Sequence, residues 1–367
     1  MSLSNNKRIV IKVGSALIAP GSDGCSPKYL KNIADFIKRC RKQGLQVILV
    51  SSGSVAAGRQ WFNVDNPSTA LKKAMAAAGQ NDMMAIWTKL LDMPLAQILL
   101  TQGDLCNRER YVSIKETIES LLEYDVLPVI NENDTVTSEE LKVGDNDNLA
   151  AMAAAAINAD TLIMCTDVDG LYDKNPHSHS DAKLLQQVDV ITPEIYAMAG
   201  GAVSSTGTGG MQTKIEAAEK ATAHGIDTFI INGFDVNSFN QLLEGKNPGT
   251  HFLSSSEPLS PAVHWMTHTV RERGEVIIND PTTPFGDNED MLTRENIIEV
   301  KGQFSAGDTI LVTTDDGTRV AKAMTNYSSC LLNYIAHEQD DIKTTDGYFS
   351  EDNSIISKEH LTVLENT

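Results

Sequence analysis

Short apolar runs alternate with longer segments of helical period through residues 1–250. The runs are rich in Val, Ile and Leu and nearly continuous, which is typical of strands buried on both faces of a parallel sheet. We predict strands at residues 8–13, 46–51, 95–100, 126–130, 161–165 and 227–231, with helices at 27–43, 68–91, 108–124, 148–158 and 210–224. This alternation indicates an α/β fold, a three-layer sandwich with a mainly parallel central sheet.

The pattern changes beyond residue 250. Residues 254–261 read SSSEPLSP, a polar segment interrupted by proline. Short alternating runs then follow, separated by Gly and Asp turns, at residues 276–278, 297–300, 309–312 and 319–324. Such runs predict a small β-rich barrel or sandwich. We therefore expect an α/β domain at 1–255, a linker at 256–274 and a β-rich domain at 275–367.

Composition is that of an ordinary globular protein. Of the 367 residues 41% are apolar and 22% charged, enough to bury a large core. The five cysteines form no CxxC pair, which favours reduced thiols and a cytoplasmic location. No apolar stretch approaches the ~20 residues of a membrane-spanning helix, and the N-terminus has no secretory pattern. We expect no membrane association.

Negative charge is concentrated near the C-terminus. The formal net charge is −19, and residues 276–367 hold 6 Lys or Arg against 17 Asp or Glu. A surface this acidic repels phosphate backbones, so the charge pattern disfavours nucleic acid as a partner.

The first two predicted strands end in residues that suit anions. Lys12 and Gly14 stand at the carboxyl end of the first strand, where parallel sheets bind ligands. A buried lysine there requires an anion, whereas an exposed one is an ordinary surface residue, and the segment alone does not decide. The second strand ends in SSGS at residues 51–54, before a small-residue helix start whose N–H groups attract carboxylate or phosphate. Ser-Gly turns also simply connect a strand to a helix.

Asn and Asp gather after the fourth predicted strand, in NEND at residues 131–134 and GDNDN at 144–148. Carboxylates bind amino groups and amides bind carboxylates, so this set suits an amino-acid ligand. A calcium-type loop and a solvated, helix-capping turn are the alternatives. The glutamate that an EF-hand needs is absent.

A glycine-rich segment, SSTGTGGMQTK at residues 204–214, precedes the helix at 210–224. Backbone amides and Lys214 at a helix start resemble a phosphate cradle. The segment is not a Walker P-loop, because its lysine does not follow glycine directly. A flexible loop remains the alternative. His264 and His268 lack a third zinc ligand, and we assign them to the linker.

Taken in order, six segments resemble the successive motifs of the glutamate 5-kinase family, which has the amino-acid kinase fold. They read KVGSALI, LVSSGSVAAGR, PVINENDTV, KVGDNDNLAA, TDVDGLY and GTGGMQTK. Individual motifs recur in acetylglutamate, uridylate and aspartate kinases, whereas NEND together with VGDNDN is specific. The tail is similar to a PUA domain. The resemblance implies ATP-dependent phosphorylation of the γ-carboxylate of L-glutamate to L-glutamyl 5-phosphate, the first step of proline biosynthesis.

The resemblance also implies roles for individual residues. The catalytic residues are then Lys12, Lys214 and Asp147, with Asp147 orienting the two lysines. The residues that contact glutamate are Ser52, Gly53, Asn131, Asp134, Asp145 and Asn146. Those that contact ATP are Lys12, Gly14, Thr166, Asp167, Thr208, Gly209, Gly210, Met211, Gln212, Thr213 and Lys214. No metal is held by protein side chains, since Mg²⁺ arrives bound to the phosphates of ATP.

The same resemblance implies a homodimer or homotetramer, and feedback inhibition by proline at a site overlapping the glutamate pocket. Because the acyl phosphate product is labile, a glutamyl-phosphate reductase is a candidate partner. One departure stands out. PUA domains carry a lysine-containing segment at their RNA surface, and here the corresponding residues 285–290 read FGDNED. We therefore expect this domain to serve stability, assembly or regulation.

The expected chemistry explains why no catalytic histidine stands out. A γ-carboxylate has an unperturbed pKa of about 4.3, so it is ionised at pH 7 and needs no general base. The reaction instead needs positive charge where two anions meet. Rival interpretations are another carboxylate or carbamate kinase of this fold, an RNA-binding or regulatory protein that retains a kinase scaffold, and a nicotinamide dehydrogenase, which the missing early GxGxxG disfavours.

Overall fold

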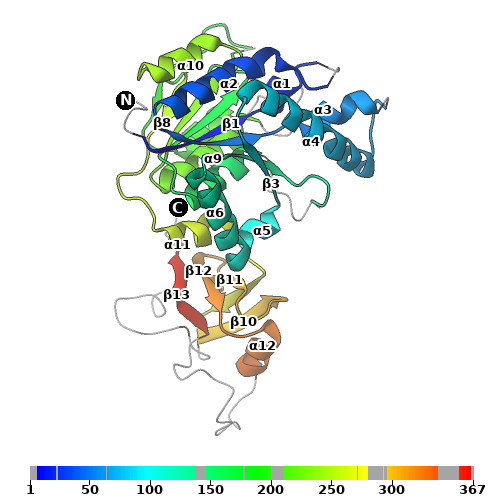
Figure 1. The fold of residues 1–367 in the computed structure, drawn as a ribbon. Helices are drawn as coiled ribbons and strands as arrows, with labels where there is room; N and C mark the ends of the chain where they lie inside the picture. The colour runs from blue at the N-terminus through cyan, green and yellow to red at the C-terminus, as the bar shows by residue number, and fades with distance from the viewer. Residues whose placement is uncertain are drawn as a thin grey trace. The chain divides into compact units, whose positions relative to one another are not determined.

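The computed structural model describes residues 6–21, 24–62, 64–137, 146–176, 178–199, 210–270, 272–279, 292, 296–337 and 355–364. The chain divides into two compact units, Met1–Leu259 and Ser260–Thr367 (Figure 1). Within the described residues, no helix is both long and apolar enough to cross a bilayer.

The first unit is built on an eight-stranded sheet with the order β3-β4-β2-β1-β5-β7-β8-β6. Its strands are β1 (Arg8–Val13), β2 (Gln46–Ser51), β3 (Leu95–Leu100), β4 (Leu127–Glu132), β5 (Thr161–Thr166), β6 (Gln187–Val188), β7 (Asp227–Asn232) and β8 (Thr250–Phe252). Every pairing is parallel except the antiparallel one between β7 and β8. The expected α/β fold with a mainly parallel sheet is confirmed.

Helices fill the connections between strands. They are α1 (Ser15–Ile18), α2 (Pro27–Lys42), α3 (Ser54–Gly58), the 3₁₀ turn η2 (Arg59–Trp61), α4 (Thr69–Leu91), α5 (Gln102–Cys106), α6 (Arg108–Glu123), α7 (Asn146–Ala156), α8 (Pro193–Ala199), α9 (Met211–Ala223) and α10 (Val236–Leu243). Local signals set some of the starts. The Ser26 hydroxyl accepts a hydrogen bond from the backbone N–H of Lys28, with Pro27 in the first turn, and Ser68 caps α4 in the same way.

The central strand β1 shows how the two faces of the sheet are used. Ile9, Ile11 and Val13 share one core with apolar residues of α2, α4 and α10. Side chains alternate along a strand, so Lys12 belongs to the opposite face, which α7 contacts. Helices therefore cover both faces of the sheet (Figure 1). Lys12 belongs to the face that α7 contacts, instead of to the core that α2 shares.

Two glycines bring α3 and α4 into direct backbone contact. A Cβ added at Gly58 would lie 1.9 Å from the Met75 carbonyl oxygen, and one at Gly79 would lie 2.0 Å from that of Ser54. The turn before α3 depends on Gly53, whose φ of 95° is in the left-handed region that favours glycine. The turn that follows β2 is thereby held firmly against the middle of α4.

The second unit carries a five-stranded sheet with the order β10-β9-β11-β12-β13. Its elements are the short helix α11 (Pro261–His264), the π-helical turn η4 (Trp265–Thr269), β9 (Gly274–Ile278), β10 (Ile297–Gly302), β11 (Thr309–Thr314), β12 (Arg319–Thr325), α12 (Ser329–His337) and β13 (Ile356–Val363). The smaller β-rich C-terminal region is confirmed, with β13 as a strand that the sequence pattern did not reveal. Residues 285–290 lie outside the described residues.

Candidate active site

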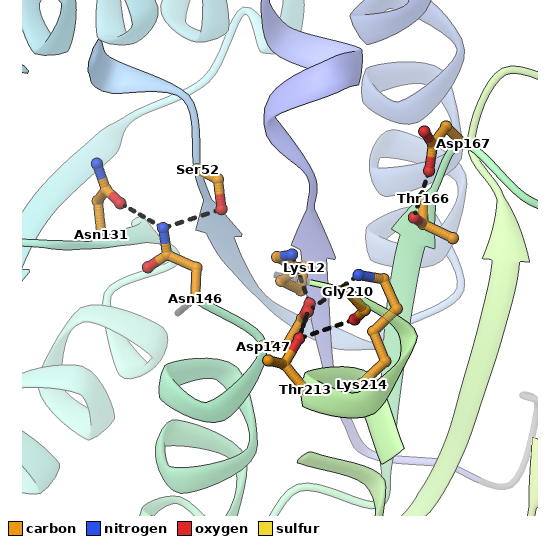
Figure 2. A network of polar contacts seen from close by, with 10 residues as sticks. All are labelled: Lys12, Ser52, Asn131, Asn146, Asp147, Thr166, Asp167, Gly210, Thr213 and Lys214. Carbon is orange, nitrogen blue, oxygen red and sulfur yellow. Dashed lines mark hydrogen bonds and ion pairs between the residues drawn. The ribbon is translucent and has the colours of Figure 1, made fainter. Parts of the chain in front are cut away.

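Polar residues from four neighbouring strands meet at the carboxyl edge of the large sheet. In spatial order, β4 contributes Asn131, the turn after β2 contributes Ser52, β1 contributes Lys12 and β5 ends at Thr166 (Figure 2). Ligands of open parallel sheets bind beyond this edge. The helices α7 and α9 begin in the same region, so their N-terminal N–H groups add anion-attracting ends.

A buried carboxylate joins two lysines at the centre of this edge. Asp147, in the first turn of α7, forms an ion pair through Oδ1 with the Lys12 ammonium group. Its Oδ2 atom lies 3.1 Å from Nζ of Lys214, in the first turn of α9. The exposed fractions are 5% for Lys12, 0% for Asp147 and 7% for Lys214. Figure 2 shows both ammonium groups directed at this one carboxylate. Lys12 and Lys214 are called the lysine pair below.

The lysine pair carries more positive charge than the Asp147 carboxylate carries negative charge. Burial alone would raise the pKa of the Asp147 carboxyl, but Lys12 and Lys214 outweigh burial and hold that pKa well below its ordinary value. Asp147 is therefore an anion at neutral pH. Asp147 contributes one negative charge against the two positive charges of Lys12 and Lys214, and this arrangement suits the binding of a further anion.

Hydrogen bonds hold the two helix starts together around the lysine pair. The Thr213 hydroxyl lies 3.2 Å from Oδ2 of Asp147 and 2.9 Å from the carbonyl oxygen of Gly210. Nearly two turns further along α9, the Lys220 ammonium group donates to Oδ1 of Asn148 at 2.6 Å. These bonds fix α7 against α9.

Amide side chains form a second polar group beside the lysine pair, on its β2 and β4 side. Nδ2 of Asn146 donates to Oγ of Ser52 at 2.9 Å and to Oδ1 of Asn131 at 2.8 Å. The Asp134 carboxylate accepts a hydrogen bond from the Ser54 hydroxyl at 2.7 Å. Ser52, Asn131, Asp134 and Asn146 are together called the amide group below. Since Asn146 and Asp147 are consecutive in α7, the amide group and the lysine pair are neighbours.

The other residues expected to contact ATP lie at the same sheet edge or at the start of α9. The Gly14 N–H donates to the Cys165 carbonyl oxygen, and the Thr166 hydroxyl to the Asp167 carboxylate. The first turn of α9 also contains Met211 and Gln212. Asp145, Thr208 and Gly209 lie outside the described residues.

Sequence reasoning missed Gln80 of α4, which accepts a hydrogen bond from Asn131 at 2.8 Å. Ser54, which donates to Asp134, lies in the SSGS segment that the sequence had singled out, although it was not among the residues expected to contact glutamate. Gln80 did leave a signal. It is the polar member of the helical face formed by Met75, Ala76, Gly79 and Met83, and a glutamine at such a position is buried.

Comparison with known proteins identifies the class. Residues 7–232 match the amino acid kinase family and residues 274–342 match the PUA domain. A carbamate kinase from Giardia lamblia, solved with AMP-PNP, superposes with a TM-score of 0.50 at 19% sequence identity, covering 69% of this chain and 100% of that one. A likeness at this identity shows the fold alone. The fold and the family match together define an amino acid kinase with an added PUA domain.

Full-length relatives narrow this class. The chain is 55% identical to glutamate 5-kinase 1 of Pseudoalteromonas translucida strain TAC 125 over 100% of both chains. It is 48% identical to glutamate 5-kinase of Idiomarina loihiensis over 98% of both. The chain belongs to the glutamate 5-kinase family, which confirms the resemblance drawn from the six motifs.

Proposed function

We propose that this protein transfers the γ-phosphoryl group of ATP to the γ-carboxylate of L-glutamate, forming L-glutamyl 5-phosphate in the first step of proline biosynthesis. The observation that carries the proposal is the buried Asp147 with the lysine pair, set between an amide group and the start of α9. The full-length similarity to glutamate 5-kinases supports the choice of substrate.

The nucleotide occupies the β5 and α9 side of the edge in this proposal. The first-turn N–H groups of α9, from Gly210 to Thr213, have no partner within the helix and suit phosphate oxygens. Thr208 and Gly209 precede this turn. Gly14, Thr166 and Asp167 bound the space next to it. Lys12 and Lys214 then lie where the γ-phosphoryl group must pass.

Glutamate occupies the β2 and β4 side. The Asp134 carboxylate suits its α-amino group. The Ser52 hydroxyl and the second amide hydrogen of Asn131 suit a carboxylate, and the Asn146 amide holds both residues in place. Gly53 and Asp145 are close by in sequence. The γ-carboxylate then reaches the lysine pair with no proton to lose, so the lysines stabilise the negative charge of the transition state without a general base.

Magnesium fits this site as part of the nucleotide. Both oxygens of the Asp147 carboxylate face ammonium groups. Among the described residues, no group of three His, Cys, Asp or Glu side chains could hold a metal ion. Mg²⁺ arriving with ATP would supply further charge neutralisation there, while the chain itself contributes the lysines and the helix N-termini.

We also propose a cytoplasmic homodimer or homotetramer that proline inhibits by competing for the glutamate pocket. Because acyl phosphates are labile, a glutamyl-phosphate reductase is the expected recipient of the product. The acidity of residues 276–367 supports a role for the PUA domain in stability, assembly or regulation, without RNA.

Hydroxylamine trapping tests the reaction. With L-glutamate, MgATP and hydroxylamine, we expect glutamyl hydroxamate and ADP in equal amounts, and proline should raise the apparent KM for glutamate. The control substrates are N-acetylglutamate, aspartate and carbamate. A higher kcat/KM for any of these would make the protein a different kinase of the same fold.

A further inference from the structure

Gln80 contacts the amide group and has a buried hydrogen-bond donor that no acceptor contacts. The residue is 7% exposed, and its Oε1 atom accepts the hydrogen bond from Nδ2 of Asn131. The other end of its amide, Nε2, is buried and has no hydrogen-bond partner. Buried polar groups are nearly always paired, so an unpaired one calls for an explanation.

The direction of this amide is fixed by the backbone. The N–H of Glu132 donates to Oδ1 of Asn131 at 2.9 Å, so that atom is the oxygen and the opposite atom of the Asn131 amide is a donor. The Gln80 atom that meets this donor must be its oxygen. Turning the Gln80 amide over would set two donors against each other, so Nε2 must be the unpaired end.

The hydrogen-bonded chain of Gln80 and the amide group therefore has an unused hydrogen-bond donor at each of its two ends. At one end lies Nε2 of Gln80. At the other, Oγ of Ser52 accepts from Asn146, and no described residue accepts the Ser52 hydroxyl proton. Between them, both hydrogens of the Asn146 amide are already used by Ser52 and Asn131. Unused donors select a ligand that accepts hydrogen bonds, and a carboxylate accepts several at once.

We propose that Gln80 binds the α-carboxylate of the amino-acid substrate and sets the enzyme's preference for a free α-carboxylate over an α-amide. The inference rests on the proposed function and extends it. The strand order supports the choice between the two carboxylates. The chain of amides runs from Ser52 toward Asn131 on β4 and Gln80 on α4, away from Lys12 on β1. The reacting γ-carboxylate must lie at the lysine pair, which leaves the α-carboxylate for the far end.

The test compares L-glutamate with its α-amide, which keeps the γ-carboxylate that reacts. In Gln80→Glu, Oε1 can still accept from Asn131, but an anionic acceptor replaces the donor Nε2. We expect kcat/KM for L-glutamate to fall roughly 10- to 100-fold, mainly through KM, as for a lost hydrogen bond to a charged group. The α-amide can donate to the new carboxylate, so the ratio of kcat/KM for L-glutamate to that for the α-amide should fall at least about 10-fold.

Gln80→Met provides a second variant that removes the donor without adding charge, and the ratio should fall there too. The matched control is Asn81→Asp, which adds the same charge to the adjacent, exposed position of α4 and should leave both substrates unchanged. An unchanged ratio in folded Gln80→Met or Gln80→Glu, judged by thermal unfolding, would refute the role of Gln80. Absence of glutamate turnover in the unaltered protein would instead refute the proposed function.

Discussion

Replacing Lys214 with alanine lowers kcat for glutamyl hydroxamate formation by about 100-fold or more, on the scale measured for a lost transition-state donor. Lys214 is buried and lies at the start of α9, where the phosphates are expected. Lys12→Ala should have an effect of the same size, because both ammonium groups meet at one carboxylate. The KM for glutamate should change much less than kcat, since the amide group remains intact.

Steady-state kinetics with saturating ATP measures the effect. Lys246→Ala is a suitable control, because the side chain of that lysine is 67% exposed and pairs with nearby Glu244. Its loss should leave kcat unchanged. Near-normal kcat in both Lys12→Ala and Lys214→Ala would contradict the role given to the lysine pair.

Replacing Asp147 with alanine should damage activity and stability together. Two buried ammonium groups would lose their counter-ion, and breaking a buried ion pair on one side costs about 3–5 kcal/mol. We expect kcat to fall about 100-fold as well, on the scale of a lost electrostatic group, because the lysine pair loses the carboxylate that positions it. Urea unfolding and the hydroxamate assay measure the two effects. Unchanged stability would show that Asp147 does not hold the lysines.

The pH dependence of stability gives an independent check on Asp147. Its pKa is lower in the folded protein, because the lysines outweigh the opposing effect of burial. The stabilisation is therefore fully present above the pKa of the unfolded carboxyl, about 3.9, and is lost as pH falls below that value toward the folded pKa. Asp147→Asn should abolish this contribution. An identical acid-unfolding profile for that variant and the unaltered protein would contradict it.

Periodicity predicted most of the α/β unit because its strands are buried on both faces. Residues 8–13, 46–51 and 95–100 form strands with the predicted bounds, and the helix predicted at 27–43 is observed as Pro27–Lys42. The strands β8 and β6, at one side of the sheet, were harder to predict from the sequence. The two-residue β6 and three-residue β8 carry too few residues for a pattern, and their pairing depends on distant partners. The strand β13 was missed because its residues ISKEHLTV mix apolar and charged positions.

The motifs located the lysine pair, but they could not show what surrounds it. Lys12 and Lys214 stand 202 positions apart in the chain, and only the crossing of β1, α7 and α9 brings both to Asp147. The structure also joins Gln80 to Asn131, a contact that no spacing predicts. Sequence supplied the chemical types, whereas the direction of each hydrogen bond required the fold.

Oxygen labelling tests most directly whether the γ-carboxylate is the phosphoryl acceptor. L-Glutamate carrying ¹⁸O in its γ-carboxylate is incubated with MgATP and hydroxylamine, and the released phosphate is analysed by mass spectrometry. Hydroxylamine attacks the acyl carbon, so the phosphate leaves with the oxygen that bridged carbon and phosphorus. Transfer to the carboxylate predicts a single ¹⁸O atom in each phosphate formed with hydroxamate. Unlabelled phosphate would contradict phosphorylation of the γ-carboxylate.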